Sequence, residues 1–84
     1  MENDLRRAVA LLQEGDWRGA HEIVQADEES RLSCWAHGIV HILEGDPANA
    51  RYWYRRAGRA FRADAAAADE VKALSAALGE ALGP

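Results

Sequence analysis

The chain has little of what marks a secreted, membrane-spanning or nucleic-acid-binding protein. Cys34 is its only cysteine, so no disulfide can form within the chain and we expect a reducing compartment. No apolar stretch approaches the roughly 20 residues that span a bilayer. The acidic start Met1-Glu2-Asn3-Asp4 also lacks the basic residues and the apolar run of a signal peptide. We therefore predict a cytoplasmic protein that does not bind membranes.

The chain also has fewer basic than acidic residues. It contains 10 Lys and Arg residues and 14 Asp and Glu residues, which gives a net charge of −4. Because nucleic-acid-binding proteins attract phosphates with a basic surface, this balance argues against a nucleic-acid partner. The 84 residues, of which 49% are hydrophobic, are enough for one domain that covers residues 1–84 and has a modest core.

One short phrase occurs twice. Glu14-Gly15-Asp16 is followed by Ala20, and 30 residues later Glu44-Gly45-Asp46 is followed by Ala50. A fixed period with a Gly-Asp hinge is typical of stacked helical hairpins, because each hairpin buries its apolar face on the next. The repeat predicts two units, over about residues 2–29 and 30–62.

Apolar residues at helical spacing predict about five helices. No run alternates apolar and polar residues with a period of two, so we expect an all-α fold without strands. Gly15 and Gly45 should end helices, while Asp16, Ser30 and Asp46 should cap the helices that follow. The expected helices cover about residues 5–12, 17–24, 30–43, 47–61 and 64–82. The last, opened by Asp64, would cap the stack.

The second unit resembles a tetratricopeptide or Sel1-like repeat. The small and aromatic residues that carry this resemblance are Gly38, Gly45, Ala50, Tyr54 and Ala57, and more thinly Ala8, Gly15, Trp17 and Ala20 in the first unit. Residues 14–60 are also similar to a group of short bacterial proteins with the same helical-repeat character, and this similarity implies no activity. The fold implied is two tandem TPR-like hairpins with a C-terminal capping helix, and the broader family implies binding of a protein or peptide.

The sequence departs from that family in two ways. The period of 30 residues is shorter than the usual 34, so the turn at residues 27–30 should be tight. Three positions that the family fills with packing residues are Cys34, His37 and His41. Their spacing of i, i+3 and i+7 places them within an arc of about 60° on one helix.

This histidine face has two interpretations. Imidazole and thiolate groups at such spacing bind zinc or a similar metal, so His21, Cys34, His37 and His41 are candidate ligands. An i,i+4 histidine pair also arises readily by chance, and buried histidines commonly donate hydrogen bonds to carboxylates, hydroxyls or carbonyls. The structural interpretation is favoured, so no metal or other cofactor is predicted. Catalysis is not expected either, because no group that would stabilise an oxyanion accompanies Cys34 and the histidines.

An arginine stripe is the other candidate binding feature. Arg51, Arg55, Arg59 and Arg62 would fall within about 80° on the fourth helix, with Tyr52 beside them. Guanidinium groups recognise carboxylates and phosphates, and a tyrosine ring adds stacking. The alternative is a solvated face whose arginines pair with Asp64, Asp69 or Glu70.

The leading functional hypothesis is a small adaptor without catalytic activity that binds a protein or peptide, possibly an acidic one. Its expected binding residues are Arg51, Tyr52, Arg55, Arg59, His37 and His41. The alternative is a protein that binds a metal or small ligand at the His37/His41 face. Acidic residues gathered over residues 22–29 would also permit a homodimer, in which they meet the arginines of a second copy.

Overall fold

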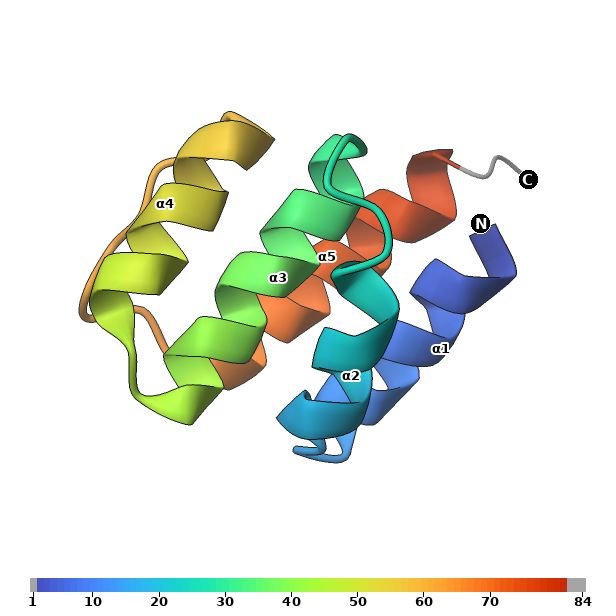
Figure 1. The fold of residues 1–84 in the computed structure, drawn as a ribbon, viewed down its shortest axis with the longest axis horizontal. Helices are drawn as coiled ribbons and strands as arrows, with labels where there is room; N and C mark the ends of the chain where they lie inside the picture. Colours follow the sequence, from blue (N-terminus) through green and yellow to red (C-terminus); the bar gives the residue numbers. More distant parts are fainter. Residues whose placement is uncertain (1, 82–84) are drawn as a thin grey trace.

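The computed structural model describes the backbone of residues 2–81 and the side chains of residues 4–81. These residues form an all-α fold without strands, as the sequence predicted. The helices are α1 (Glu2–Gln13), α2 (Trp17–Val24), α3 (Arg31–Glu44), α4 (Pro47–Ala57) and α5 (Ala67–Ala81) (Figure 1). None of them is long and apolar enough to cross a membrane.

The repeated Glu-Gly-Asp phrase forms the turn inside each helical hairpin. Gly15 and Gly45 adopt φ values of +81° and +89°, a left-handed conformation that favours glycine and ends α1 and α3. The aspartate that follows then caps the next helix. Asp16 Oδ1 accepts a hydrogen bond from the backbone N–H of Gly19 at 3.0 Å, and Asp46 Oδ1 accepts one from Asn49 at 3.2 Å.

The turn between the two hairpins is short, as the 30-residue period required. Asp27 Oδ1 accepts hydrogen bonds from the backbone N–H groups of Glu29 and Ser30, both at 3.1 Å. Ser30 then caps α3 by accepting from the N–H of Ser33 at 3.3 Å. The predicted cap of α3 at Ser30 is therefore confirmed.

The fourth helix is shorter than predicted. Gly58 takes a φ of +72°, and the N–H of Arg59 bonds back to the carbonyl of Tyr54 at 3.0 Å, which closes α4 at Ala57. The prediction that this helix runs to Phe61 is wrong, because a glycine inside the apparent helical pattern serves as its C-terminal cap.

The fifth helix starts later than predicted. Asp64 lies in a turn in which the N–H of Ala65 donates to the carbonyl of Arg62 at 3.1 Å. The first helical bond of α5 runs from the N–H of Glu70 to the carbonyl of Ala66 at 3.2 Å, so Asp64 does not open the helix. Val71, Leu74 and Leu78 form its buried stripe, and residue 82, where the expected helix ended, lies outside the described residues.

Helix α3 is the centre of the molecule and packs against each of the other four helices. Helices α1, α2, α3 and α4 follow one another as neighbours, and α5, which lies behind α3 in Figure 1, packs on α3 and α1. All residues of α3 from Ser33 to His41 are consequently buried. Two of the three histidines thus belong to the most enclosed helix.

Candidate functional site: a histidine cluster and an arginine face

Helices α2 and α3 bring all three histidines of the chain together. His21 comes from α2, and His37 and His41 lie one turn apart on α3. The ring centroids are separated by 4.9 Å between His21 and His37, 5.5 Å between His21 and His41, and 5.1 Å between His37 and His41. One nitrogen of each ring lies within 4.8 Å of the other two, so His21, a candidate ligand in the sequence, does approach His37 and His41. We call these three residues the histidine cluster.

His37 is held in place by a tryptophan. Its ring stacks on Trp53 of α4 with the centroids 3.7 Å apart and the planes 8° from parallel. Only 3% of His37 is exposed, and its Nδ1 atom is buried without a hydrogen-bond partner. Burial, with smaller contributions from His21 and His41, lowers the pKa of His37 to about 4. The ring is therefore neutral at physiological pH.

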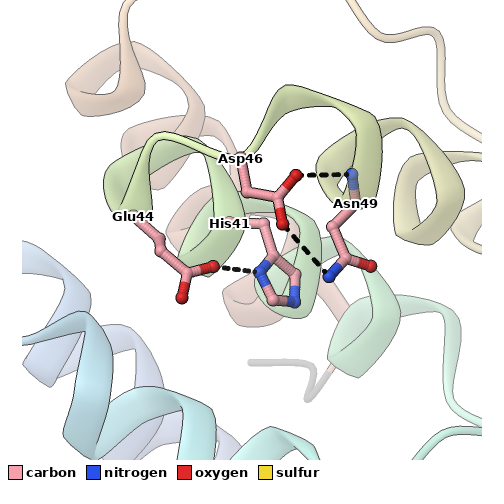
Figure 2. A network of polar contacts seen from close by, with 4 residues as sticks. All are labelled: His41, Glu44, Asp46 and Asn49. Carbon is pink, nitrogen blue, oxygen red and sulfur yellow. Dashed lines mark hydrogen bonds and ion pairs between the residues drawn. The ribbon is translucent and has the colours of Figure 1, made fainter.

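His41 has a carboxylate partner on its own helix. Its Nδ1 lies 2.8 Å from Oε1 of Glu44, one turn further along α3 (Figure 2). Asp46 lies beside this pair and also accepts a hydrogen bond from the side-chain amide of Asn49 at 3.4 Å. Glu44 thus orients the His41 ring and leaves its Nε2 atom as the remaining nitrogen.

Cys34 does not belong to the histidine cluster. It is buried, and its thiol donates a weak hydrogen bond to the carbonyl oxygen of Glu28 at 3.4 Å. Among residues 4–81, the group of metal-ligating side chains that contains His37 includes His21 and His41 but not Cys34. The sequence-based inclusion of Cys34 is wrong, because a spacing of i, i+3 puts it at the far end of the arc, next to the α2–α3 turn.

The arginine stripe is only partly helical. Arg51 and Arg55 lie one turn apart on α4 and are exposed, with Tyr52 beside them. Arg59 and Arg62 follow the end of α4, so the predicted four-arginine arc on one helix is wrong for both of them. Arg56 is a further exposed arginine of α4. We call Arg51, Tyr52, Arg55, Arg56 and Arg59 the arginine face.

Aromatic rings hold three of these guanidinium groups. Arg59 lies over the ring of Trp35 on α3 with its Cζ 3.5 Å from the centroid. Arg51 lies 5.0 Å above Phe61, in the segment that follows α4. Such contacts are favourable and restrict the guanidinium plane while its N–H groups stay available.

Arg56 is fixed by hydrogen bonds as well as by rings. It donates from Nη2 to the carbonyl oxygen of Glu28 at 2.6 Å and from Nη1 to the hydroxyl of Tyr52 at 3.5 Å. Its Cζ also lies 5.5 Å from the centroid of Trp53. Arg56 thereby joins the α2–α3 turn to α4.

The arginines of this face have no carboxylate partner. Among residues 4–81 the one ion pair within 4.0 Å is that of His41 and Glu44, although acidic residues outnumber basic ones. The expected pairing with Glu70 is not observed, because Glu70 accepts a hydrogen bond from the hydroxyl of Tyr54 instead. Burial and this bond raise the pKa of Tyr54 above its usual range.

The acidic segment over residues 22–29 meets the arginine face at one point. Glu22, Glu28 and Glu29 are exposed, whereas the carboxylate of Asp27 is occupied by the backbone of its own turn. The group that Arg56 contacts is the carbonyl oxygen of Glu28. The contact therefore joins Arg56 to the backbone of this segment and not to one of its carboxylates.

Sequence reasoning did not find the aromatic partners of either feature. Trp35 and Trp53 are buried, and their positions under Arg59 and His37 depend on the α3–α4 packing. Comparisons with protein-family models, with curated proteins and with solved structures found no match. The resemblance to tetratricopeptide or Sel1-like repeats therefore stays a prediction.

Proposed function

We propose that the protein is a small helical adaptor whose arginine face binds an acidic segment of a protein partner. The observation that carries this proposal is the set of exposed, uncompensated arginines on an otherwise acidic molecule. No Lys or Arg among residues 4–81 forms an ion pair, so what distinguishes this face is how its guanidinium groups are held. Arg51, Arg56 and Arg59 lie on aromatic rings, and Arg56 also donates to a backbone carbonyl.

Preorganisation supports the same function. Arg51, Arg56 and Arg59 contact aromatic rings, so less side-chain entropy is lost when their N–H groups bind an anion. Tyr52 is 45% exposed and is the one large hydrophobic side chain exposed among residues 4–81. An exposed aromatic among arginines suits a peptide that presents both carboxylates and apolar groups.

The net charge of −4 favours a peptide over a nucleic acid. A long polyanion would meet repulsion from the surrounding acidic surface, including the residues next to Arg56, whereas a short acidic segment can stay within the arginine face. The negative charge of this peptide segment would come from carboxylate or phosphate groups, both of which guanidinium groups bind.

The test is binding of a fluorescein-labelled, glutamate-rich peptide, followed by anisotropy at low and physiological salt. We expect saturable binding that weakens as salt rises, because the contacts are exposed ion pairs. Arg51→Glu together with Arg55→Glu should abolish it. The matched control is Arg6→Glu with Arg7→Glu, which makes the same charge change on exposed residues of α1.

The comparison between the two double variants decides the result. Equal losses in both would mean that the peptide senses only net charge, and the proposal would fail. Tighter binding of a labelled single-stranded oligonucleotide than of the peptide would replace the acidic segment with a nucleic acid. Self-association removed by Arg51→Glu with Arg55→Glu would make a second copy of the chain the partner.

A further inference from the structure

We propose that His21, His37 and His41 form a binding site for one divalent transition-metal ion, held between α2 and α3. The site is separate from the arginine face and does not depend on its function. It uses every histidine in the chain, and these three side chains come from two helices that meet side by side.

The geometry is close to that of a bound metal. Histidine nitrogens bind zinc at about 2.0–2.1 Å, so the nitrogens of two ligands on one tetrahedral ion are about 3.3 Å apart. The three nitrogens now lie within 4.8 Å of one another. The pair His37 and His41 has the i,i+4 spacing by which two histidines on one helix face bind a metal together. His21 supplies the third ligand and is only half-buried, so it has room to turn toward the ion.

The enclosure of His37 suits a metal ligand. A metal binds the neutral ring through the lone pair of one nitrogen. His37 is buried beside the rings of His21 and His41, and Trp53 fixes the plane of its ring. A purely structural histidine at this depth would be expected to have its nitrogens hydrogen-bonded, yet Nδ1 of His37 is buried without a partner.

Glu44 supports the site by contacting the ligand His41 without binding the metal itself. A metal-binding histidine usually donates its other ring N–H to a carboxylate, which fixes the tautomer and makes the ligand more basic. The 2.8 Å contact between Nδ1 of His41 and Glu44 is this arrangement, and it leaves Nε2 for the metal. We assign Glu44 as a positioning residue.

The ligand set also selects the metal. Three neutral imidazoles without an oxygen ligand suit Zn²⁺, Co²⁺, Ni²⁺ or Cu²⁺ and disfavour Mg²⁺ and Ca²⁺, which require oxygen donors. Three protein ligands also leave a fourth tetrahedral position for water or an external ligand.

The experiment uses untagged protein, freed of metal with a chelator that is then removed. Titration with Co²⁺ followed by visible absorption reports both the stoichiometry and the geometry, and calorimetry with Zn²⁺ gives the affinity. We expect one ion per chain, an intense tetrahedral cobalt spectrum, and no heat with Mg²⁺. Bound Zn²⁺ should also raise the melting temperature, because the ion binds the folded state.

Variants separate this site from surface binding. His21→Ala changes a half-buried side chain and should fold, and we expect it to lose the cobalt spectrum. Glu44→Gln should keep the spectrum but weaken binding by about 10- to 100-fold. Cys34→Ala is the matched control and should bind like the wild type, because the thiol contacts Glu28 instead.

Three results would overturn the proposal. The first is the absence of any zinc or cobalt binding to the folded wild-type protein. The second is binding that survives in His21→Ala, which would place the metal elsewhere. The third is one ion per two chains with dimerisation in the ultracentrifuge, which would make the ion a bridge between exposed groups of two molecules.

Discussion

Gly38 occupies a position where the ring of Tyr54 takes the space of a side chain. A Cβ atom added at Gly38 would lie 2.6 Å from Cε1 of Tyr54 and 3.3 Å from the carbonyl oxygen of Ala50. Tyr54 is 1% exposed and cannot swing away, and the carbonyl belongs to the backbone of α4. We expect Gly38→Ala to lower the free energy of unfolding by about 1–3 kcal/mol, measured by urea denaturation.

Gly79 provides the control for this substitution. It lies in α5, is exposed, and a Cβ atom there would meet nothing within 4 Å. Gly79→Ala should therefore raise the free energy of unfolding by about 0.5–1 kcal/mol through helix propensity alone. Two alanine variants of equal stability would contradict the proposed contact between α3 and Tyr54.

His37 should make stability depend on pH. Its pKa is lowered to about 4 in the folded state, against an ordinary value of 6.5. Between those values the unfolded chain binds the proton and the folded chain does not, so the free energy of unfolding falls as pH decreases. Relative to its value at pH 7, the free energy of unfolding falls progressively from about pH 6.5 to pH 4. The decrease due to His37 amounts to about 3 kcal/mol at most.

Urea denaturation at pH 7, 6, 5 and 4, with a chelator present, measures this slope. His37→Phe keeps a ring against Trp53 but has no proton to gain, so its stability should fall less steeply over the same range. The other titratable residues are the same in both proteins, so the difference between the two slopes reports on His37. Parallel curves for wild type and variant would show that His37 accepts its proton without leaving the folded state.

At the scale of elements, the caps decide where helices begin. Asp46 accepts a hydrogen bond from the backbone of Asn49 and another from its side-chain amide. Asp46→Ala should cost about 1 kcal/mol, in line with the loss of an N-cap, as judged by the midpoint of chemical denaturation. Asp64→Ala removes an exposed aspartate that caps no helix, so it should leave the midpoint unchanged.

The same caps explain how far the elements could be predicted from sequence. Asp16, Ser30 and Asp46 act through local geometry, and the helices that they start were placed correctly. Gly58 was missed because one glycine inside a helical pattern reads as either a tolerated residue or an end. Asp64 was misplaced because a good capping residue does not require a helix to follow it immediately.

For the whole molecule, α5 is what encloses the core on the side of α1 and α3. Leu74 is fully buried there. Leu74→Ala should lower the free energy of unfolding by about 2–5 kcal/mol. This is a large part of the total of roughly 4–13 kcal/mol expected for a domain of this size. Unfolding followed by far-ultraviolet and by near-ultraviolet circular dichroism should give the same decrease in the free energy of unfolding. Lys72 is exposed and lies two residues earlier in the same helix, so Lys72→Ala should change neither.

Global packing set the limit of sequence-based reasoning about function. The chain indicated that His37 and His41 share a face, since that is a property of helical spacing, and it offered His21 as a candidate from another helix. The stacking of His37 on Trp53 and the exclusion of Cys34 depend on how α3 meets α4 and the preceding turn. Likewise, the lack of carboxylates around Arg51 and Arg59 became apparent only once the acidic side chains had been placed.

The parallel contact between His37 and Trp53 gives this molecule an optical reporter of its own. An indole in face-to-face contact with an imidazole loses emission when that ring gains a positive charge, and a paramagnetic ion such as Cu²⁺ quenches it further. Trp17 and Trp35 do not stack on a histidine among residues 4–81, so they would supply a steady background. Trp53 emission should therefore reveal protons or metal arriving at His37 in real time, without any attached dye.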